Sequence, residues 1–257
     1  MKKLLPVLLC AAMLLCLLPL EARAAAAAWD GTVDISWYDP AQTEYTIDTP
    51  AKLAGLAALV NGMADPAAKA IVGDRSYLVS KKVDNVMLVG AGGGNVFDTV
   101  YTGGVDFAYK TIYLTADLDM GGRKAADGSW TGPNWTPIGG KFPMKPQEAS
   151  GDCLTLDTRF NGVLDGQGHT IYNLYCDRYA AKGFPYSMAV GVVGFLGGNA
   201  DYANGGNGEK TEAEFKNGWQ PAVRNLVLGS GSIYGRRMVG GIVGRVGETS
   251  NGVVIEN

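Results

Sequence analysis

Short apolar segments separated by glycines recur along the second half of the chain and constrain its fold more than any other feature. The stretch from Phe160 to Leu174 reads as a strand, a glycine turn and a second strand. Two later segments each hold two aliphatic residues between glycines, namely Gly191 and Gly194 in the first and Gly241 and Gly244 in the second. Because one such unit cannot bury its own apolar face, units of this kind fold by stacking on one another.

A second repeated phrase carries an asparagine. Ile171-Tyr172-Asn173-Leu174 is echoed by Val223-Arg224-Asn225-Leu226 and, in part, by the residues that end at Asn257, with steps of 52 and 32 residues between the asparagines. Two interpretations stay open: the three amides stack as a ladder at one corner, or asparagine simply suits a turn. The longer step predicts an insertion, which we place at residues 199–220.

One helix is predicted ahead of the repeats, at residues 50–61. Thr49 can cap it, Pro50 suits its first position, Asn61-Gly62 ends it, and its apolar residues form one stripe. Before it, residues 29–38 alternate apolar and polar side chains as a half-buried strand does. We expect residues 25–85 to cap a stacked region over 86–257, since an uncovered first coil exposes its core and its strand edges.

The first 24 residues have the pattern of a secretory signal peptide. Lys2 and Lys3 precede an apolar run from Leu4 to Leu20, and Ala22-Arg23-Ala24 supplies a cleavage site. The alternative, a membrane-spanning helix, is disfavoured by the shortness of the run and its two prolines. Cleavage after Ala24 predicts a secreted, extracellular or cell-wall associated protein with no membrane span in the mature chain.

The mature composition excludes some partners. Removal of three basic residues and one acidic residue moves the formal net charge from -3 to -5, and no basic patch with interleaved aromatics stands out, so nucleic acid is not an expected partner. Thirty-seven glycines and only 18% charged residues favour tight turns between short strands. Cys153 and Cys176 either form a disulfide after export or stay as small buried groups.

Candidate catalytic residues were sought among the acidic side chains, and none is assigned. Asp117 and Asp119 would point the same way from a strand, Asp165 lies in an Asp-Gly turn, and Arg159 or Arg178 is the nearest candidate base. The alternative is that the aspartates accept hydrogen bonds from backbone N–H groups of turns. The single histidine, His169, excludes a multi-histidine zinc site, and no metal or cofactor is predicted.

Aromatic residues raise a different possibility, stacking on sugar rings. Most of the five tryptophans are expected in the core or at its edges. Trp219 lies within the glycine-rich insertion and is the one that we single out as a ligand-binding residue, with Asp117, Asp119 and Asp165 as further candidates.

The phrases at 160–174, 191–194 and 241–244 resemble the Gly-Leu-x-Gly (GLUG) motif repeats of bacterial surface proteins, with valine or isoleucine in place of the leucine. The resemblance implies a mainly β fold, a right-handed parallel β-helix with an N-terminal capping strand and amphipathic helix. It also implies a cell-surface location and continuation into further repeats or a wall-attachment domain. It supplies no catalytic residues.

Two functions from different classes therefore remain open. The first is a non-enzymatic adhesin or spacer, which could bind host or cell-wall glycans or matrix through its corner loops. The second is a carbohydrate-active β-helix enzyme, a polysaccharide lyase or hydrolase, which rests on analogy of fold. We also expect the repeats to be incomplete at the C-terminus, with 253–255 forming a strand that exposes an apolar, aggregation-prone end.

Overall fold

The computed structural model describes residues 27–62, 81–89, 95–102, 104–143, 155–178, 188–198, 213–235 and 237–257. The protein is mainly β, and most of its strands pair in parallel. The proposed signal peptide and Cys153 lie outside the described residues. Within the described residues, no helix has the length and apolar character needed to cross a membrane.

The largest sheet contains five parallel strands, each contributed by a later part of the chain. Their order is β1 (Glu44–Ile47), β4 (Thr111–Leu114), β10 (Val163–Asp165), β15 (Ala222–Arg224) and β20 (Val254–Glu256). We call the chain from one of these strands to the next a coil. The five strands pair in register at Glu44, Thr111, Val163, Ala222 and Val254. The successive coils are therefore 67, 52, 59 and 32 residues long. Parallel pairing of successive coils is compatible with a β-helix.

The remaining parallel strands repeat this stacking around the coil. They are β5 (Leu118–Asp119), β11 (Thr170–Tyr172) and β16 (Val227–Leu228) in one sheet, and the pairs β12 (Leu174–Asp177) with β17 (Gly231–Tyr234), β13 (Met188–Val190) with β18 (Arg237–Val239), and β14 (Val193–Leu196) with β19 (Val243–Val246). Apolar columns run through the stack. Ile112, Leu164 and Val223, for example, are neighbours in register and almost fully buried.

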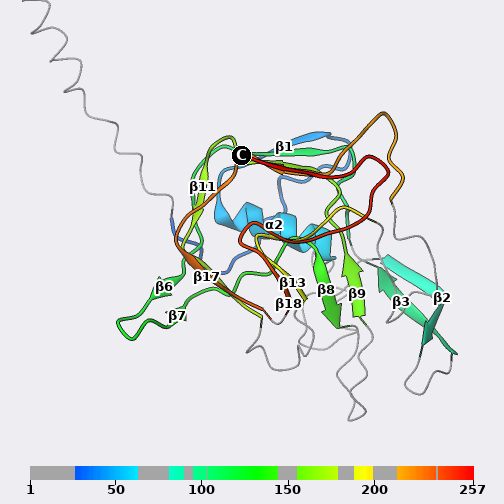
Figure 1. Cartoon of the computed structure of the whole chain (residues 1–257), viewed down its shortest axis with the longest axis horizontal. Helices are drawn as coiled ribbons and strands as arrows, with labels where there is room; N and C mark the ends of the chain where they lie inside the picture. The colour runs from blue at the N-terminus through cyan, green and yellow to red at the C-terminus, as the bar shows by residue number, and fades with distance from the viewer. Residues whose placement is uncertain are drawn as a thin grey trace, which may run out of the picture.

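Three antiparallel hairpins leave the stack, as Figure 1 shows. They are β2 (Lys81–Val89) with β3 (Asn95–Thr102), β6 (Arg123–Lys124) with β7 (Trp130–Thr131), and β8 (Gly140–Pro143) with β9 (Thr155–Thr158). The predicted start of the stacked region, residue 86, falls inside β2. The parallel stack instead includes β1 at residue 44, because the first coil begins before the helix.

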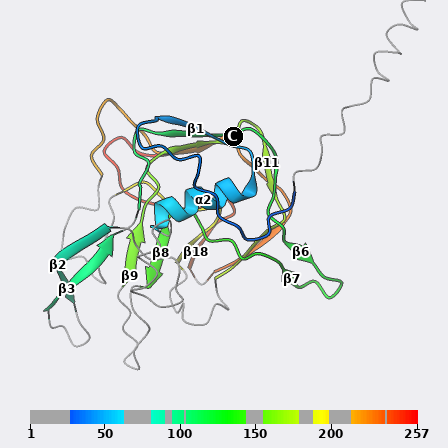
Figure 2. The same ribbon diagram turned by 180° about the vertical axis from the view of Figure 1, so that it is seen from behind.

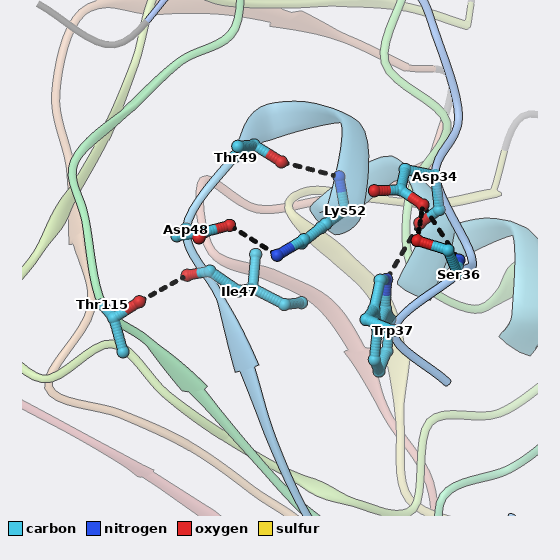
Figure 3. Close-up of polar contacts among 8 residues, drawn as sticks. All are labelled: Asp34, Ser36, Trp37, Ile47, Asp48, Thr49, Lys52 and Thr115. Carbon is cyan, nitrogen blue, oxygen red and sulfur yellow. Dashed lines mark hydrogen bonds and ion pairs between the residues drawn. The ribbon is translucent and has the colours of Figure 1, made fainter. Parts of the chain in front are cut away.

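The helix α2 (Pro50–Asn61) has the bounds that the sequence predicts. The Thr49 side chain accepts a hydrogen bond from the Lys52 N–H, and Gly62 ends the helix in the left-handed conformation with φ of 78°. Lys52 also forms an ion pair with Asp48 at 2.9 Å (Figure 3). Local capping therefore fixes both ends of the helix.

The expectation of an amphipathic helix is wrong, because α2 is buried almost all round. Every residue of α2 except Ala51 and Lys52 is buried, and Figures 1 and 2 show the helix inside the outline of the strands. Residues 29–38 cover the side of α2 that carries Gly55. They approach so closely that a Cβ atom on Gly55 would lie 1.9 Å from the Asp34 carbonyl oxygen. Small residues on that side of α2 make this approach possible.

The covering segment is not the strand that its alternation predicts. Val33 and Ile35 are exposed, and the Asp30 and Asp34 carboxylates accept hydrogen bonds from the backbone N–H groups of Thr32 and Ser36. Such bonds between a side chain and the backbone two residues on compete with strand pairing. The backbone N–H of Trp29 instead ties the segment to the Asp119 carbonyl, and the Trp37 indole donates to the Asp34 carbonyl within the segment (Figure 3).

Asn61 joins the end of α2 to the second coil. Its amide nitrogen donates to the Pro137 carbonyl at 2.9 Å, and its oxygen accepts from the Gly139 N–H at 3.1 Å and the Thr158 hydroxyl at 2.9 Å. The side chain is fully buried. Ile138 lies between these two backbone partners and pairs in parallel with Val193 of the next coil. The amide thus occupies the place of a neighbouring strand.

The repeated asparagines do not stack as one ladder. Leu164 pairs with Val223 and Ile171 with Leu228, so Asn173 faces Ser230 rather than Asn225. Asn173 and Asn225 both adopt left-handed φ angles, 56° and 50°, at two different corners. Asn257 follows Glu256, which pairs with Arg224, and so lies in line with Asn225 alone. Asparagine tolerates this left-handed conformation. The repeated phrase therefore marks a type of corner and does not give the length of the repeat.

The glycine segments do stack. Val193 pairs with Val243, which sets Gly194 beside Gly244, and the Val192 N–H donates to the Gly241 carbonyl at 3.1 Å just after Gly191. A Cβ atom on Gly194 would lie 2.3 Å from the Gly139 carbonyl oxygen, and one on Gly244 would lie 2.5 Å from the Val190 nitrogen. Backbone crowding between coils therefore requires glycine at both positions.

The last coil leaves its apolar side uncovered. Ile255, Val239 and Val246 are 52%, 46% and 45% exposed, while their paired neighbours Val223, Val190 and Leu196 are at most 1% exposed. Val227, Tyr234 and Met238 of the same coil are exposed as well. The inward columns of the stack thus continue to a surface where no described residue covers them.

A substitution at Asn61 tests the strand-like role of its amide. Asn61→Leu keeps the volume but leaves the Gly139 N–H, the Pro137 carbonyl and the Thr158 hydroxyl without partners, so we expect a loss of about 2–4 kcal/mol in the free energy of unfolding by urea. Asn134 is a matched control, because its exposed amide forms two 2.9 Å hydrogen bonds with the Asp177 backbone. Asn134→Leu should cost less than about 1 kcal/mol, and equal losses would contradict the argument.

Self-association tests the open edge of the last coil. We expect residues 25–257 to associate in a concentration-dependent way, because unpaired strand edges and apolar columns meet there. Lysines at Val239 and Ile255 should reduce the association seen by sedimentation velocity without changing the thermal midpoint. Lysine at Val33, which is 50% exposed near the other end of the chain, should not reduce it. A monodisperse wild-type monomer would disprove the expectation.

Candidate binding surface

The three candidate aspartates lie on the outside of the stack, each against the next coil. The Asp117 carboxylate is 3.0 Å from His169 Nδ1 and accepts from the Thr170 N–H at 3.1 Å. Asp119 accepts from the Gly121 N–H at 2.9 Å and the Asn173 amide at 3.0 Å. These contacts tie neighbouring coils together, and the structure does not bring the three carboxylates to one centre.

Asp165 is the most buried of them. Its carboxylate accepts from the Gln167 N–H at 3.0 Å, the Asn225 amide at 3.1 Å and Arg224 Nε at 2.9 Å. Burial alone raises the pKa of this carboxyl, but the hydrogen bonds from Gln167, Asn225 and Arg224 outweigh it and hold the pKa below its usual value. Asp165 therefore stays ionised as part of a hydrogen-bonded corner.

The two arginines considered as bases lie away from these carboxylates. Arg159 is buried, with its guanidinium carbon 3.2 Å from the centroid of the Phe195 ring. Arg178 is also buried and donates to the Trp135 carbonyl and the Thr136 hydroxyl. Both guanidinium groups thus contact groups other than Asp117, Asp119 and Asp165.

Metal and thiol chemistry are not favoured by the described residues. No group of three or more His, Cys, Asp or Glu side chains gathers among them. Cys176 is buried in the core, where its environment raises the pKa of the thiol to about 11, chiefly through desolvation. It packs as a small apolar group, one of the two alternatives for this residue.

Trp219 belongs to a cluster of three aromatic side chains at the corner that precedes the five-stranded sheet. The Tyr109 ring lies 5.5 Å from Trp219 and 6.1 Å from Phe215, measured between ring centroids. We call Tyr109, Phe215 and Trp219 the aromatic corner. Tyr109 lies two residues before β4 and Trp219 three before β15, so stacking of coils brings together residues that are far apart in sequence.

Hydrogen bonds fix this corner to the coils above and below. The Trp219 indole donates to the Asn161 carbonyl at 2.9 Å, and the Asn251 amide donates to the Phe215 and Trp219 carbonyls at 3.2 and 3.1 Å. The Lys216 N–H donates to the Tyr109 hydroxyl at 2.8 Å. The aromatic residues are therefore held in one arrangement by backbone contacts and not by the ring contacts alone.

Sequence reasoning selected Trp219 but missed Tyr109 and Phe215. Trp219 is half-buried, whereas Tyr109 is 43% exposed. The asparagine phrase suggested a step of 52 residues between coils. This step placed the third coil at the wrong position, so it did not reveal that Tyr109 and Trp219 are neighbours. Aligning the strands themselves, Thr111 through Val163 with Ala222, would have revealed it.

Comparisons with known proteins give one similarity. The chain is 34% identical over 142 residues to Halomucin of Haloquadratum walsbyi (strain DSM 16790 / HBSQ001), which covers 52% of this chain. The match spans about 1% of the length of that curated relative. No protein-family model matches the chain. No solved structure matches it.

The dependence of the free energy of unfolding on acidic pH tests the role of Asp165. Because its folded pKa is lowered, the stabilisation is present above the unfolded pKa of about 4 and is lost as the pH falls through the folded pKa. Asp165→Asn should lower the free energy of unfolding at pH 7 by about 1–3 kcal/mol and make its decline below pH 5 shallower, as measured by urea unfolding across pH. Asp127→Asn, at the exposed tip between β6 and β7, should change stability much less.

Proposed function

We propose that this chain is a module of an exported cell-surface protein, and that it acts as a non-enzymatic adhesin or spacer. The observation that carries the proposal is the parallel stacking of β1, β4, β10, β15 and β20, which builds one continuous face from five stretches of chain. Stacked repeats of this kind extend by adding coils, as projecting surface modules do. The similarity to Halomucin, whose name denotes a mucin, supports a surface or secreted location.

The finer architecture belongs to the same proposal. We infer a right-handed parallel β-helix of GLUG-like coils, in which β1 and α2 close the first coil. Two observations support it: the Asn61 amide takes the place of a strand beside Ile138, and the glycines at 194 and 244 stack at close backbone approach. Residues 1–24 act as the signal peptide in this proposal.

The uncovered last coil supports a further part of the proposal. Its inward columns end in exposed aliphatic side chains, and no described strand pairs with its outer edge, whereas the other coils bury such side chains and edges against each other. We propose that further repeats cover this edge in the protein at work, and that a wall-attachment domain holds the assembly at the cell surface.

We favour the non-enzymatic role over the carbohydrate-active enzyme. The carboxylates that would serve catalysis instead accept hydrogen bonds from neighbouring coils. A β-helix lyase or hydrolase rests on analogy of fold alone.

Export is tested by fusing residues 1–257 to a reporter that is active only outside the bacterial cytoplasm. We expect reporter activity, with the mature N-terminus at Ala25 by N-terminal sequencing. Lysines at Ala22 and Ala24 should block processing, since signal peptidase reads small residues there. Reporter retained in the cytoplasm would overturn the proposal, and release of unsaturated or reducing ends from pectin or alginate by residues 25–257 would overturn its non-enzymatic part.

A further inference from the structure

The aromatic corner is separate from the hydrophobic core. Among the described residues, Tyr109, Phe215 and Trp219 belong neither to the buried core cluster nor to the side chains packed against it. Grouped, partly exposed aromatic rings cost hydration free energy unless they contact something. A fixed group of aromatic rings outside the core, one of them 43% exposed, is the kind of surface that takes part in binding.

The backbone at this corner is strained in a way that presents Tyr109. Its φ angle is 64°, in the left-handed region that bulky side chains rarely adopt, and nearby Phe107 and Asn217 have φ angles of 59° and 56°. The hydrogen bond from Lys216 and the loop fixed by Asn251 maintain this arrangement. A ring that is held in place before a ligand arrives loses little conformational entropy on binding.

The chemistry around the ring narrows the class of ligand. The Tyr109 hydroxyl accepts the Lys216 N–H, which holds the exposed ring in place, and its O–H can still donate. Exposed Asn217 and Gln220 place amide groups in the same loop, and exposed Glu214 and Lys216 carry opposite charges. An apolar ring beside amides and without net charge matches an uncharged sugar, which has an apolar C–H face and a rim of hydroxyls.

We propose that the aromatic corner binds a neutral, pyranose-based polysaccharide, with the Tyr109 ring as the contact surface and Trp219 as its support. Trp219 is half-buried and its indole N–H is bonded to the Asn161 carbonyl, so it positions the loop and Tyr109 takes the contact role. This inference rests on the proposed function as a surface module and names the partner of that module.

The test measures binding of residues 25–257 to soluble polysaccharides by affinity gel electrophoresis and calorimetry. The probes are the neutral polymers xyloglucan, galactomannan and mannan, and the acidic polymers hyaluronan and polygalacturonate. We expect binding to at least one neutral polymer and about tenfold or greater weakening by Tyr109→Ala. Tyr109→Phe keeps the ring and loses only the hydroxyl, with its acceptor and donor, so it should retain binding within about threefold.

Tyr234→Ala is the matched control, because Tyr234 is 60% exposed on β17 and has no part in the aromatic corner. It should leave binding unchanged. If Tyr109→Ala proves unfolded by circular dichroism, Gln220→Ala in the same loop takes its place and should weaken binding. Undiminished binding by a folded Tyr109→Ala protein (or by Gln220→Ala where it takes its place), tighter binding to the acidic polymers, or no binding to any neutral polymer would overturn the inference. None of these results bears on export, so the proposed function and this inference fail separately.

Discussion

Every backbone group along the edge of a coil needs a partner, and this requirement shapes the rest of the structure. Where two coils run side by side, the hydrogen bonds between their parallel strands satisfy this requirement. Where a strand is missing, an amide side chain meets it instead: Asn61 bonds on either side of Ile138, and Asn134 bonds the N–H and carbonyl of Asp177. A side-chain amide carries the same donor and acceptor as a peptide group, so it can continue a ladder for one position.

Close stacking then decides which residues the corners accept. Glycines permit the approach at Gly194 and Gly244, while asparagines in the left-handed conformation turn the chain at Asn173 and Asn225. Polar side chains on the outside, among them Asp119 and Asp165, bond to the coil above and below. The interior is filled by aliphatic columns and by large buried rings, among them Trp135 and Phe160.

Local signals predicted the parts of the fold that depend on neighbouring residues. The helix at 50–61 was predictable because Thr49, Pro50 and Gly62 act within one turn of it. Its complete burial was less evident, although the lack of any charge after Lys52 and the small residues at 54, 55, 57 and 58 were a signal for it. The alternation at 29–38 misled because Asp30 and Asp34 bond locally and bend the backbone.

Long-range register was not predictable from the asparagine phrase, because Asn173 and Asn225 lie at different corners of successive coils. For the same reason, no local pattern indicated that Tyr109 is a neighbour of Trp219. Placement of the aspartates on the outside followed from strand alternation, but their partners Asn173, Arg224 and Asn225 come from other coils and required the correct register.

The spacing between paired strands has a consequence for how such a chain can change. Coils of 67, 52, 59 and 32 residues each contribute one strand to the five-stranded sheet, and part of the extra length of the first two forms the hairpins β2–β3, β6–β7 and β8–β9. Lengthening or deleting one excursion therefore need not disturb the pairing of its neighbours. The outward surface of each coil can therefore change in evolution independently of the others, while the packing of the shared interior stays the same.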